Sequence, residues 1–142
     1  MVDGSVLLPL DELFEHSREV LAELPFAKLM GMRLVEMKLD EAVIELQMRD
    51  DLRQPSGILH GGATATLIDT AMAFAVRTRV EPATATATID LTVHYLRPHL
   101  EGPLTCRAKV VRAGRRIFSV SADVTAESGK LIATGLSTYT IV

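Results

Sequence analysis

The spacing of apolar residues changes along the chain and predicts different elements in its first and last parts. In residues 10–24 apolar positions recur every three or four residues, with charged residues between them. This period predicts an amphipathic helix that Pro25 ends. From residue 84 onwards apolar and polar residues alternate, as in strands with one buried face, and they do so over the ranges 84–96, 104–112, 115–126 and 131–141.

The strand expected at residues 84–96 alternates strictly. Because side chains of a strand point to opposite faces in turn, Ile89, Leu91 and Val93 are expected on one face and Thr88 on the other. The turns between the last three strands are short, so those strands are expected to be antiparallel.

A long apolar segment follows His60-Gly61-Gly62 and contains one acidic residue, Asp69. The segment is rich in Ala, Leu and Met and is apolar on nearly every side, which predicts a buried helix. A carboxylate there is costly unless it is hydrogen-bonded, paired or protonated, so Asp69 is a candidate acid, base or nucleophile. The alternatives are a plain turn at the glycines, and a structural ion pair or cap at Asp69.

The predicted elements are most simply arranged as one sheet around one helix. Two strands at residues 33–38 and 42–48 precede the buried helix, four strands follow it, and residues 25–31 form a short packed turn closed by Gly31. This order predicts an α+β protein with an extra N-terminal helix. We expect residues 1–24 to be a leader with this helix, and residues 25–142 to be the domain itself.

Composition excludes several classes of protein. The 142 residues fit one domain, and a formal net charge of −3 argues against a general nucleic-acid binder. The single cysteine, Cys106, permits no internal disulfide, and no apolar run reaches the length of a membrane span. We therefore expect a soluble cytoplasmic protein that binds neither membranes nor nucleic acid.

Motifs of several competing chemistries are absent from the sequence. It has no Gly-x-Ser-x-Gly elbow, no phosphate-binding Gly-Lys-Ser/Thr and no Cys-x-x-Cys. His94 and His99 have no partners at the spacing of metal ligands. We expect neither a metal nor a cofactor.

The chain resembles the hotdog-fold acyl-CoA thioesterases, in particular their phenylacetate-pathway (PaaI-type) branch, over about residues 25–142. The matching residues are Pro25-Phe26, Gly31-Met32, His60-Gly61-Gly62 with Asp69 nine positions after the histidine, the strand Thr88-Ile89-Asp90-Leu91-Thr92-Val93-His94-Tyr95-Leu96-Arg97-Pro98, and Gly114-Arg115-Arg116.

This resemblance implies a sheet curled around the central helix, homodimers with a continuous sheet that usually pair into homotetramers, and hydrolysis of acyl-CoA. It implies that Asp69 is the catalytic carboxylate, as general base or nucleophile. It further implies that the Gly61 N–H polarises the thioester carbonyl, that the Gln54 amide helps to hold that carbonyl or the water, and that the Thr88 hydroxyl assists the water.

The residues suggest further contacts with substrate. Arg97, Arg115 and Arg116 suit the phosphates of coenzyme A, because guanidinium groups match phosphate geometry; the alternative is a solvated strand end. His60 and Gly62 flank the proposed carbonyl site. A histidine at such a junction either takes part directly or fixes the loop by hydrogen bonding.

The spacing of Gly61 and Asp69 bears on the oligomer. Asp69 lies eight positions after Gly61, which is roughly 12 Å along a helix. Reacting groups must come within about 3–3.5 Å, so the two residues are expected to reach one thioester from two chains. The alternative is that Gly61 precedes the helix and its loop folds back.

Two other functions remain open. One is a hotdog dehydratase or hydratase, which would use a His-Asp pair. The other is a non-catalytic acyl-CoA binding module, which would not need the acid. The combination of Asp69, Gly61 and Gln54 favours the thioesterase.

Overall fold

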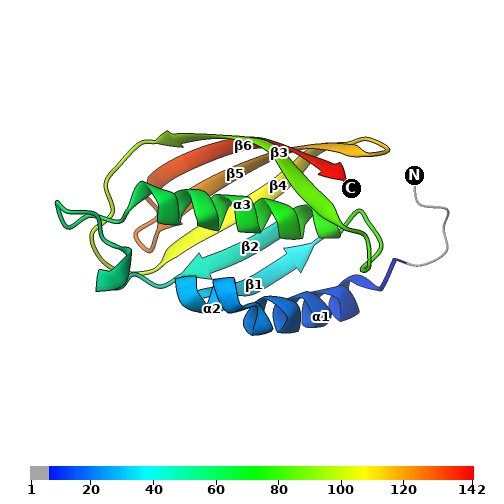
Figure 1. Cartoon of the computed structure of the whole chain (residues 1–142), viewed down its shortest axis with the longest axis horizontal. Helices are drawn as coiled ribbons and strands as arrows, with labels where there is room; N and C mark the ends of the chain where they lie inside the picture. The colour runs from blue at the N-terminus through cyan, green and yellow to red at the C-terminus, as the bar shows by residue number, and fades with distance from the viewer. Residues whose placement is uncertain (1–6) are drawn as a thin grey trace.

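The computed structural model of the protein describes residues 7–142. These residues form one antiparallel sheet, three helices and a single 3₁₀ turn (Figure 1). The helices are α1 (Leu10–Glu23), α2 (Pro25–Met30) and α3 (Gly61–Arg77), and the turn is η1 (Asp50–Leu52). The strands are β1 (Met32–Lys38), β2 (Glu41–Leu46), β3 (Thr86–Tyr95), β4 (Leu104–Ala113), β5 (Ile117–Ala126) and β6 (Leu131–Ile141).

The sheet has the strand order β1-β2-β4-β5-β6-β3, and every neighbouring pair is antiparallel. It curves around α3, which lies along its concave face (Figure 1). β3 joins β6 at one edge although β3 comes earlier in the chain, because the long connection through α3 carries it across. The predicted α+β arrangement of a sheet around one buried helix is confirmed.

The helix α3 is buried because its apolar side chains face the sheet on several sides. Leu67, Ile68, Ala71 and Met72 have no exposed surface. The helix also approaches β6 closely at Gly135, where an added Cβ would lie 2.7 Å from Ile68 Cγ2. Only a glycine permits this approach, and it brings the middle of α3 near the β6 residues that follow.

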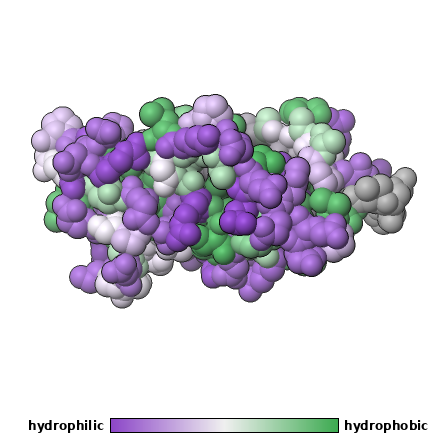
Figure 2. All heavy atoms as spheres, turned by 90° about the horizontal axis from the view of Figure 1, so that it is seen from below, coloured by the Kyte–Doolittle hydropathy of each residue, from purple (hydrophilic) through white to green (hydrophobic). Residues whose placement is uncertain are grey.

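The helix α1 packs against β1 and covers that end of the sheet. Its buried side chains are Leu13, Ser17 and Leu21, one amphipathic stripe as predicted. The other side is polar, and the surface seen from below in Figure 2 is mostly hydrophilic with separate apolar patches.

The predicted packed turn at residues 25–31 is instead the helix α2, and this expectation was wrong in detail. Pro25 is its first residue, where a proline needs no N–H and its fixed φ suits the helix. Gly31 ends it at φ 79°, a left-handed conformation that glycine adopts without strain.

The strict alternation predicted for β3 is also wrong, because the strand contains a β-bulge. Its pairing with β6 shifts between Thr88 and Asp90, so Ile89 is an extra residue. One extra residue turns every later side chain to the face opposite to the one that strict alternation predicts. Thr88 therefore faces α3, as do Leu91 and Val93 beyond the bulge, while Ile89 is 55% exposed.

Candidate active site

Asp69 lies near the middle of α3 with two hydroxyl groups bound to one of its carboxylate oxygens. Thr88 Oγ1 donates to Asp69 Oδ1 over 2.7 Å, and the Tyr139 hydroxyl donates to the same oxygen over 2.5 Å. Oδ2 has no hydrogen-bond partner among residues 7–142. We call Asp69, Thr88 and Tyr139 the carboxylate cluster. One oxygen of the carboxylate is anchored, and the other is available for chemistry.

The register of the sheet brings the two donors together. Thr88 on β3 and Tyr139 on β6 are directly opposed residues of the antiparallel pair, and they share the face towards α3. The bulge lies after Thr88 and lets Leu91 and Val93 share the face of Thr88, and Gly135 on β6 lets the helix approach. The cluster therefore depends on contacts between a helix and two strands that are distant in sequence.

The members of the cluster differ in exposure. Tyr139 is 2% exposed, whereas Asp69 is half-buried and Thr88 is exposed. Burial, aided by the hydrogen bond to Asp69, raises the pKa of the Tyr139 phenol well above its usual value. The phenol therefore keeps its proton and acts as a donor, while the carboxylate can still be reached from outside.

The N-terminal end of α3 presents a free backbone donor. His60 is the N-cap, and its Nδ1 accepts a hydrogen bond of 2.8 Å from the Gly62 N–H. The Gly61 N–H has no acceptor among residues 7–142. Of the two glycine N–H groups, only that of Gly61 is available, and the helix dipole adds partial positive charge there.

Gly61 borders an open cavity of about 370 Å³, which we call the Gly61 pocket. Gln54, Tyr95 and Arg97 line it as well. The Tyr95 hydroxyl donates to the Gly61 carbonyl over 2.7 Å, and a Cβ at Gly61 would lie 3.3 Å from the Tyr95 phenol. The glycine thus permits a close contact that fixes the start of the helix.

The loop before α3 orients the Gln54 side chain. Its Oε1 accepts a hydrogen bond of 2.5 Å from the Ser56 N–H, and the backbone groups of Gln54 bond to Gly57 and Ile58. The carbonyl side of the amide is therefore occupied. Its NH₂ group remains as a donor at the wall of the pocket.

Gly61 and Asp69 are separated within one chain. Gly61 is the first residue of α3, so the eight helical positions from Gly61 to Asp69 span roughly 12 Å. The alternative in which a loop folds Gly61 back towards Asp69 is excluded. The carboxylate cluster and the Gly61 pocket are two distinct places in the chain.

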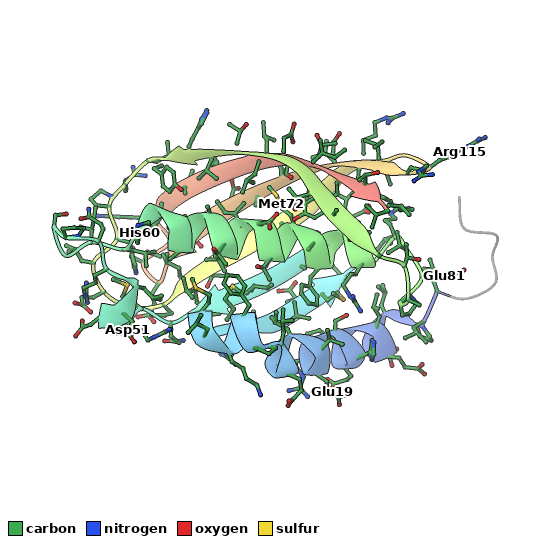
Figure 3. All side chains as sticks on the ribbon, in the orientation of Figure 1. Glu19, Asp51, His60, Met72, Glu81 and Arg115 are labelled. Carbon is green, nitrogen blue, oxygen red and sulfur yellow. The ribbon has the colours of Figure 1, made fainter. Side chains whose placement is uncertain are left out.

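The three arginines expected to contact phosphate are also divided. Arg97 lines the Gly61 pocket and donates to the Leu131 carbonyl over 2.7 Å. Arg115 and Arg116 follow β4 on the hairpin to β5, and Figure 3 shows Arg115 at the opposite end of the molecule from His60. Arg115 lines a second cavity, of about 960 Å³, with Arg79 and Arg112.

Sequence reasoning missed Tyr139 and Tyr95, which bond to Asp69 and Gly61. Both lie on strands, where a tyrosine is common. The one available signal was that Tyr139 lies on the apolar face of its strand, where a buried hydroxyl needs a partner.

Among residues 7–142, neither the cysteine thiol nor a metal cluster offers a second centre. Cys106 is fully buried, and this burial raises the pKa of its thiol. Residues 7–142 contain no group of three His, Cys, Asp or Glu side chains placed to hold a metal. Over the same residues, no helix is long and apolar enough to cross a membrane.

Comparison with known proteins identifies the family. Residues 56–133 match the model of the thioesterase superfamily, which is more than half of the chain. Human acyl-coenzyme A thioesterase 13 is 30% identical over 118 residues, covering 80% of this chain and 82% of the human protein.

Solved structures agree with this match. Conserved protein PA5202 from Pseudomonas aeruginosa has a TM-score of 0.82 at 29% identity, covering 87% of this chain and 98% of that one. The E. coli PaaI protein from the phenylacetic acid degradation operon has a TM-score of 0.85 at 21% identity, covering 93% and 94%. The latter identity supports the fold alone. The chain therefore belongs to the thioesterase superfamily, as a thioester hydrolase of hotdog fold.

Proposed function

We propose that the protein hydrolyses the thioester of an acyl- or aryl-CoA to the free acid and coenzyme A, with Asp69 as the catalytic carboxylate. The observation that carries this proposal is the Asp69 side chain itself, with Oδ1 held by two hydroxyls and Oδ2 unbonded. A carboxylate on an otherwise apolar helix costs stability, and catalysis is a physical reason to keep it. The human relative is named as an acyl-coenzyme A thioesterase.

Asp69 Oδ2 can act in two ways. As a general base it takes a proton from a water whose oxygen bonds to the thioester carbon. As a nucleophile it bonds to that carbon itself, and water later hydrolyses the resulting anhydride. In both routes the carbonyl oxygen becomes an oxyanion, the carbon–sulfur bond breaks, and the thiolate leaves and takes up a proton. Thr88 Oγ1 is bonded to Oδ1 over 2.7 Å, which supports the proposal that its hydroxyl assists the attacking water.

The Gly61 pocket supplies the complementary charge. The free Gly61 N–H at the start of α3 stabilises the oxyanion, and a donor of this kind is worth about 10²–10³ in rate. The Gln54 NH₂ group adds a second donor at the pocket wall. His60 fixes the loop by its bond to Gly62, and its exposed ring can also contact the substrate.

The distance of roughly 12 Å between Gly61 and Asp69 requires two chains for one site. We infer a two-fold dimer in which Gly61 of one chain meets Asp69 of the other, giving two equivalent sites. β3 supports this assembly, because its outer edge has no neighbouring strand among residues 7–142. Pairing of two β3 edges would continue the sheet across the dimer, and two such dimers would form the homotetramer.

The same symmetry suggests where phosphates bind. If Gly61 of each chain meets Asp69 of the other chain, the two α3 helices run antiparallel. The C-terminal end of one helix then extends roughly 12 Å beyond the start of the other helix. That end carries the cavity lined by Arg79, Arg112 and Arg115. Arg97 of one chain and the β4–β5 hairpin of the other, which carries Arg115 and Arg116, thus offer phosphate contacts on either side of the thioester.

A thiol-release assay tests this function. The purified protein is incubated with aliphatic, aryl and hydroxyaryl CoA thioesters, and free thiol and acid are both quantified. We expect equal amounts of acid and thiol from at least one class. Binding without release would indicate the non-catalytic module, and a change in the acyl chain without thiol release would indicate a dehydratase or hydratase.

A further inference from the structure

Tyr139 is a buried ionisable residue that the chemistry above does not use directly. It lies 2% exposed on β6 and cannot touch a substrate that approaches Asp69 from outside. Its hydroxyl nevertheless reaches Asp69 Oδ1 over 2.5 Å and the Asp69 carbonyl over 2.6 Å. Its single proton is therefore shared between two oxygens of the same residue.

The geometry at Asp69 distinguishes its two carboxylate oxygens. Both hydroxyl donors, from Thr88 and Tyr139, bond to Oδ1, and neither bonds to Oδ2. Hydrogen bonds to an ionised oxygen are short and stronger than neutral ones. Two such bonds on one oxygen fix the rotation of the carboxylate, so that Oδ2 points in a single direction.

Of the two donors, Tyr139 is the one held in place. Its ring is packed in the core between its cross-strand neighbours Thr88 on β3 and Phe118 on β5. Gly135, on the same face of β6, brings the strand close to α3. Thr88 is exposed, so water can compete for its hydroxyl. The core thus presents the phenol to Asp69 at a fixed position.

We propose that Tyr139 is a positioning residue of the catalytic carboxylate. Its hydroxyl anchors Asp69 Oδ1, so that Oδ2 is the oxygen that acts as base or nucleophile. This inference rests on the proposed role of Asp69. Tyr139 acts through Asp69 and has no other path to the substrate. Its removal should lower turnover and leave substrate binding unchanged.

The first test is the Tyr139→Phe variant, which keeps the ring and removes only the hydroxyl. We expect kcat to fall about 10–100-fold, the size expected for a hydrogen bond to a charged group, with KM within about twofold of wild type. Ser137→Ala is the matched control. It removes another buried hydroxyl of β6, one that is bonded to the Asp90 carbonyl over 2.5 Å and not to Asp69. The control should keep its kcat.

The second test is a double-mutant cycle with Asp69→Asn, measured at raised enzyme concentration. If Tyr139 acts only through the carboxylate, Asp69→Asn with Tyr139→Phe should be as active as Asp69→Asn alone, within about twofold. A merely structural role would multiply the two losses. An unchanged kcat in Tyr139→Phe, or multiplied losses in the double variant, would overturn the inference.

A third measurement needs no substitution of Tyr139. The chain has two tyrosines, Tyr95 and Tyr139, so labelling the phenolic carbon of tyrosine with ¹³C gives two NMR signals that Tyr95→Phe assigns. We expect Asp69→Asn to shift the Tyr139 signal and leave that of Tyr95. No shift would contradict the contact. The outcomes also separate the two proposals, because wild-type turnover in Asp69→Asn would refute the catalytic role of Asp69 itself.

Discussion

The carboxylate cluster and the Gly61 pocket lie on the same helix and are built in opposite ways. The cluster consists of side chains from α3, β3 and β6 that meet near the β3 edge of the sheet, beside the middle of α3. The pocket offers chiefly a backbone N–H, exposed because a helix begins there and because His60 caps the neighbouring N–H. One place supplies a negative charge, and the other a donor at the positive end of a dipole.

In the proposed mechanism, this difference is the reason why neither place forms a site alone. A base without a donor for the oxyanion, or a donor without a base, supplies half of the chemistry of thioester hydrolysis. A helix fixes the spacing of the two halves at roughly 12 Å in one chain. In the proposed dimer, a second copy with an antiparallel helix removes this separation without any change of fold.

The largest effect is expected from Asp69→Asn. This variant keeps the size of the side chain and its acceptor oxygen but removes the charge. We expect kcat to fall by at least about 10²-fold, the usual contribution of a catalytic base, while circular dichroism stays unchanged. Thiol release at a rate near wild type from folded protein would remove Asp69 from the mechanism.

Gly61→Pro tests the backbone donor directly. Proline fits the first position of a helix, and His60 before it has φ −63° and ψ 133°, a conformation compatible with a following proline. The variant deletes the N–H, so we expect kcat to fall about 10²–10³-fold.

Gly61→Ala is the control for this change. It places a Cβ at the same 3.3 Å from the Tyr95 phenol but keeps the N–H. We expect the kcat of Gly61→Ala to stay close to that of wild type, in contrast to the kcat of Gly61→Pro. Equal losses in the two variants would mean that crowding against Tyr95, not the N–H, is responsible.

Gln54→Ala should have a smaller effect, about 10–10²-fold on kcat/KM. It removes one side-chain donor from the Gly61 pocket and leaves the Gly61 N–H in place. Steady-state kinetics on the preferred CoA ester measure it. An unchanged kcat/KM would show that Gln54 only shapes the turn to Ser56.

His60→Ala is expected to affect stability more than chemistry. Loss of the N-cap bond to Gly62 should lower the free energy of unfolding by about 0.5–2 kcal/mol, which denaturant titration measures. His60→Ser restores a capping oxygen and should recover most of this loss. If both variants lose activity as strongly as Gln54→Ala does, the imidazole contacts the substrate.

The sequence was sufficient to predict what depends on local pattern. The Ala-, Leu- and Met-rich segment that is apolar on nearly every side predicted the buried helix, and the glycines marked its start. Asp69 was recognisable because a charge inside an apolar helix is rare. The pairing of His60 with Gly62 likewise agrees with the loop-fixing reading of that histidine.

Features that depend on register could not be predicted. The bulge at Ile89 reverses the facing of β3, and nothing in the alternation of that strand reveals it. The contact of Tyr139 with Asp69 joins residues that are 70 positions apart. The separation of Arg97 from Arg115 likewise follows from which end of the sheet each turn occupies.

The central claim is that Gly61 of one chain and Asp69 of another act on one thioester, and mixed dimers test it most directly. Asp69→Asn and Gly61→Pro chains, each nearly inactive, are unfolded, mixed in equal amounts and refolded together, with distinct tags to quantify heterodimers. Random pairing makes half of the dimers mixed, each with one intact site of two, so about a quarter of wild-type activity should return. Activity that stays at the average of the two variants, with heterodimers shown to form, would mean that each site is built within a single chain.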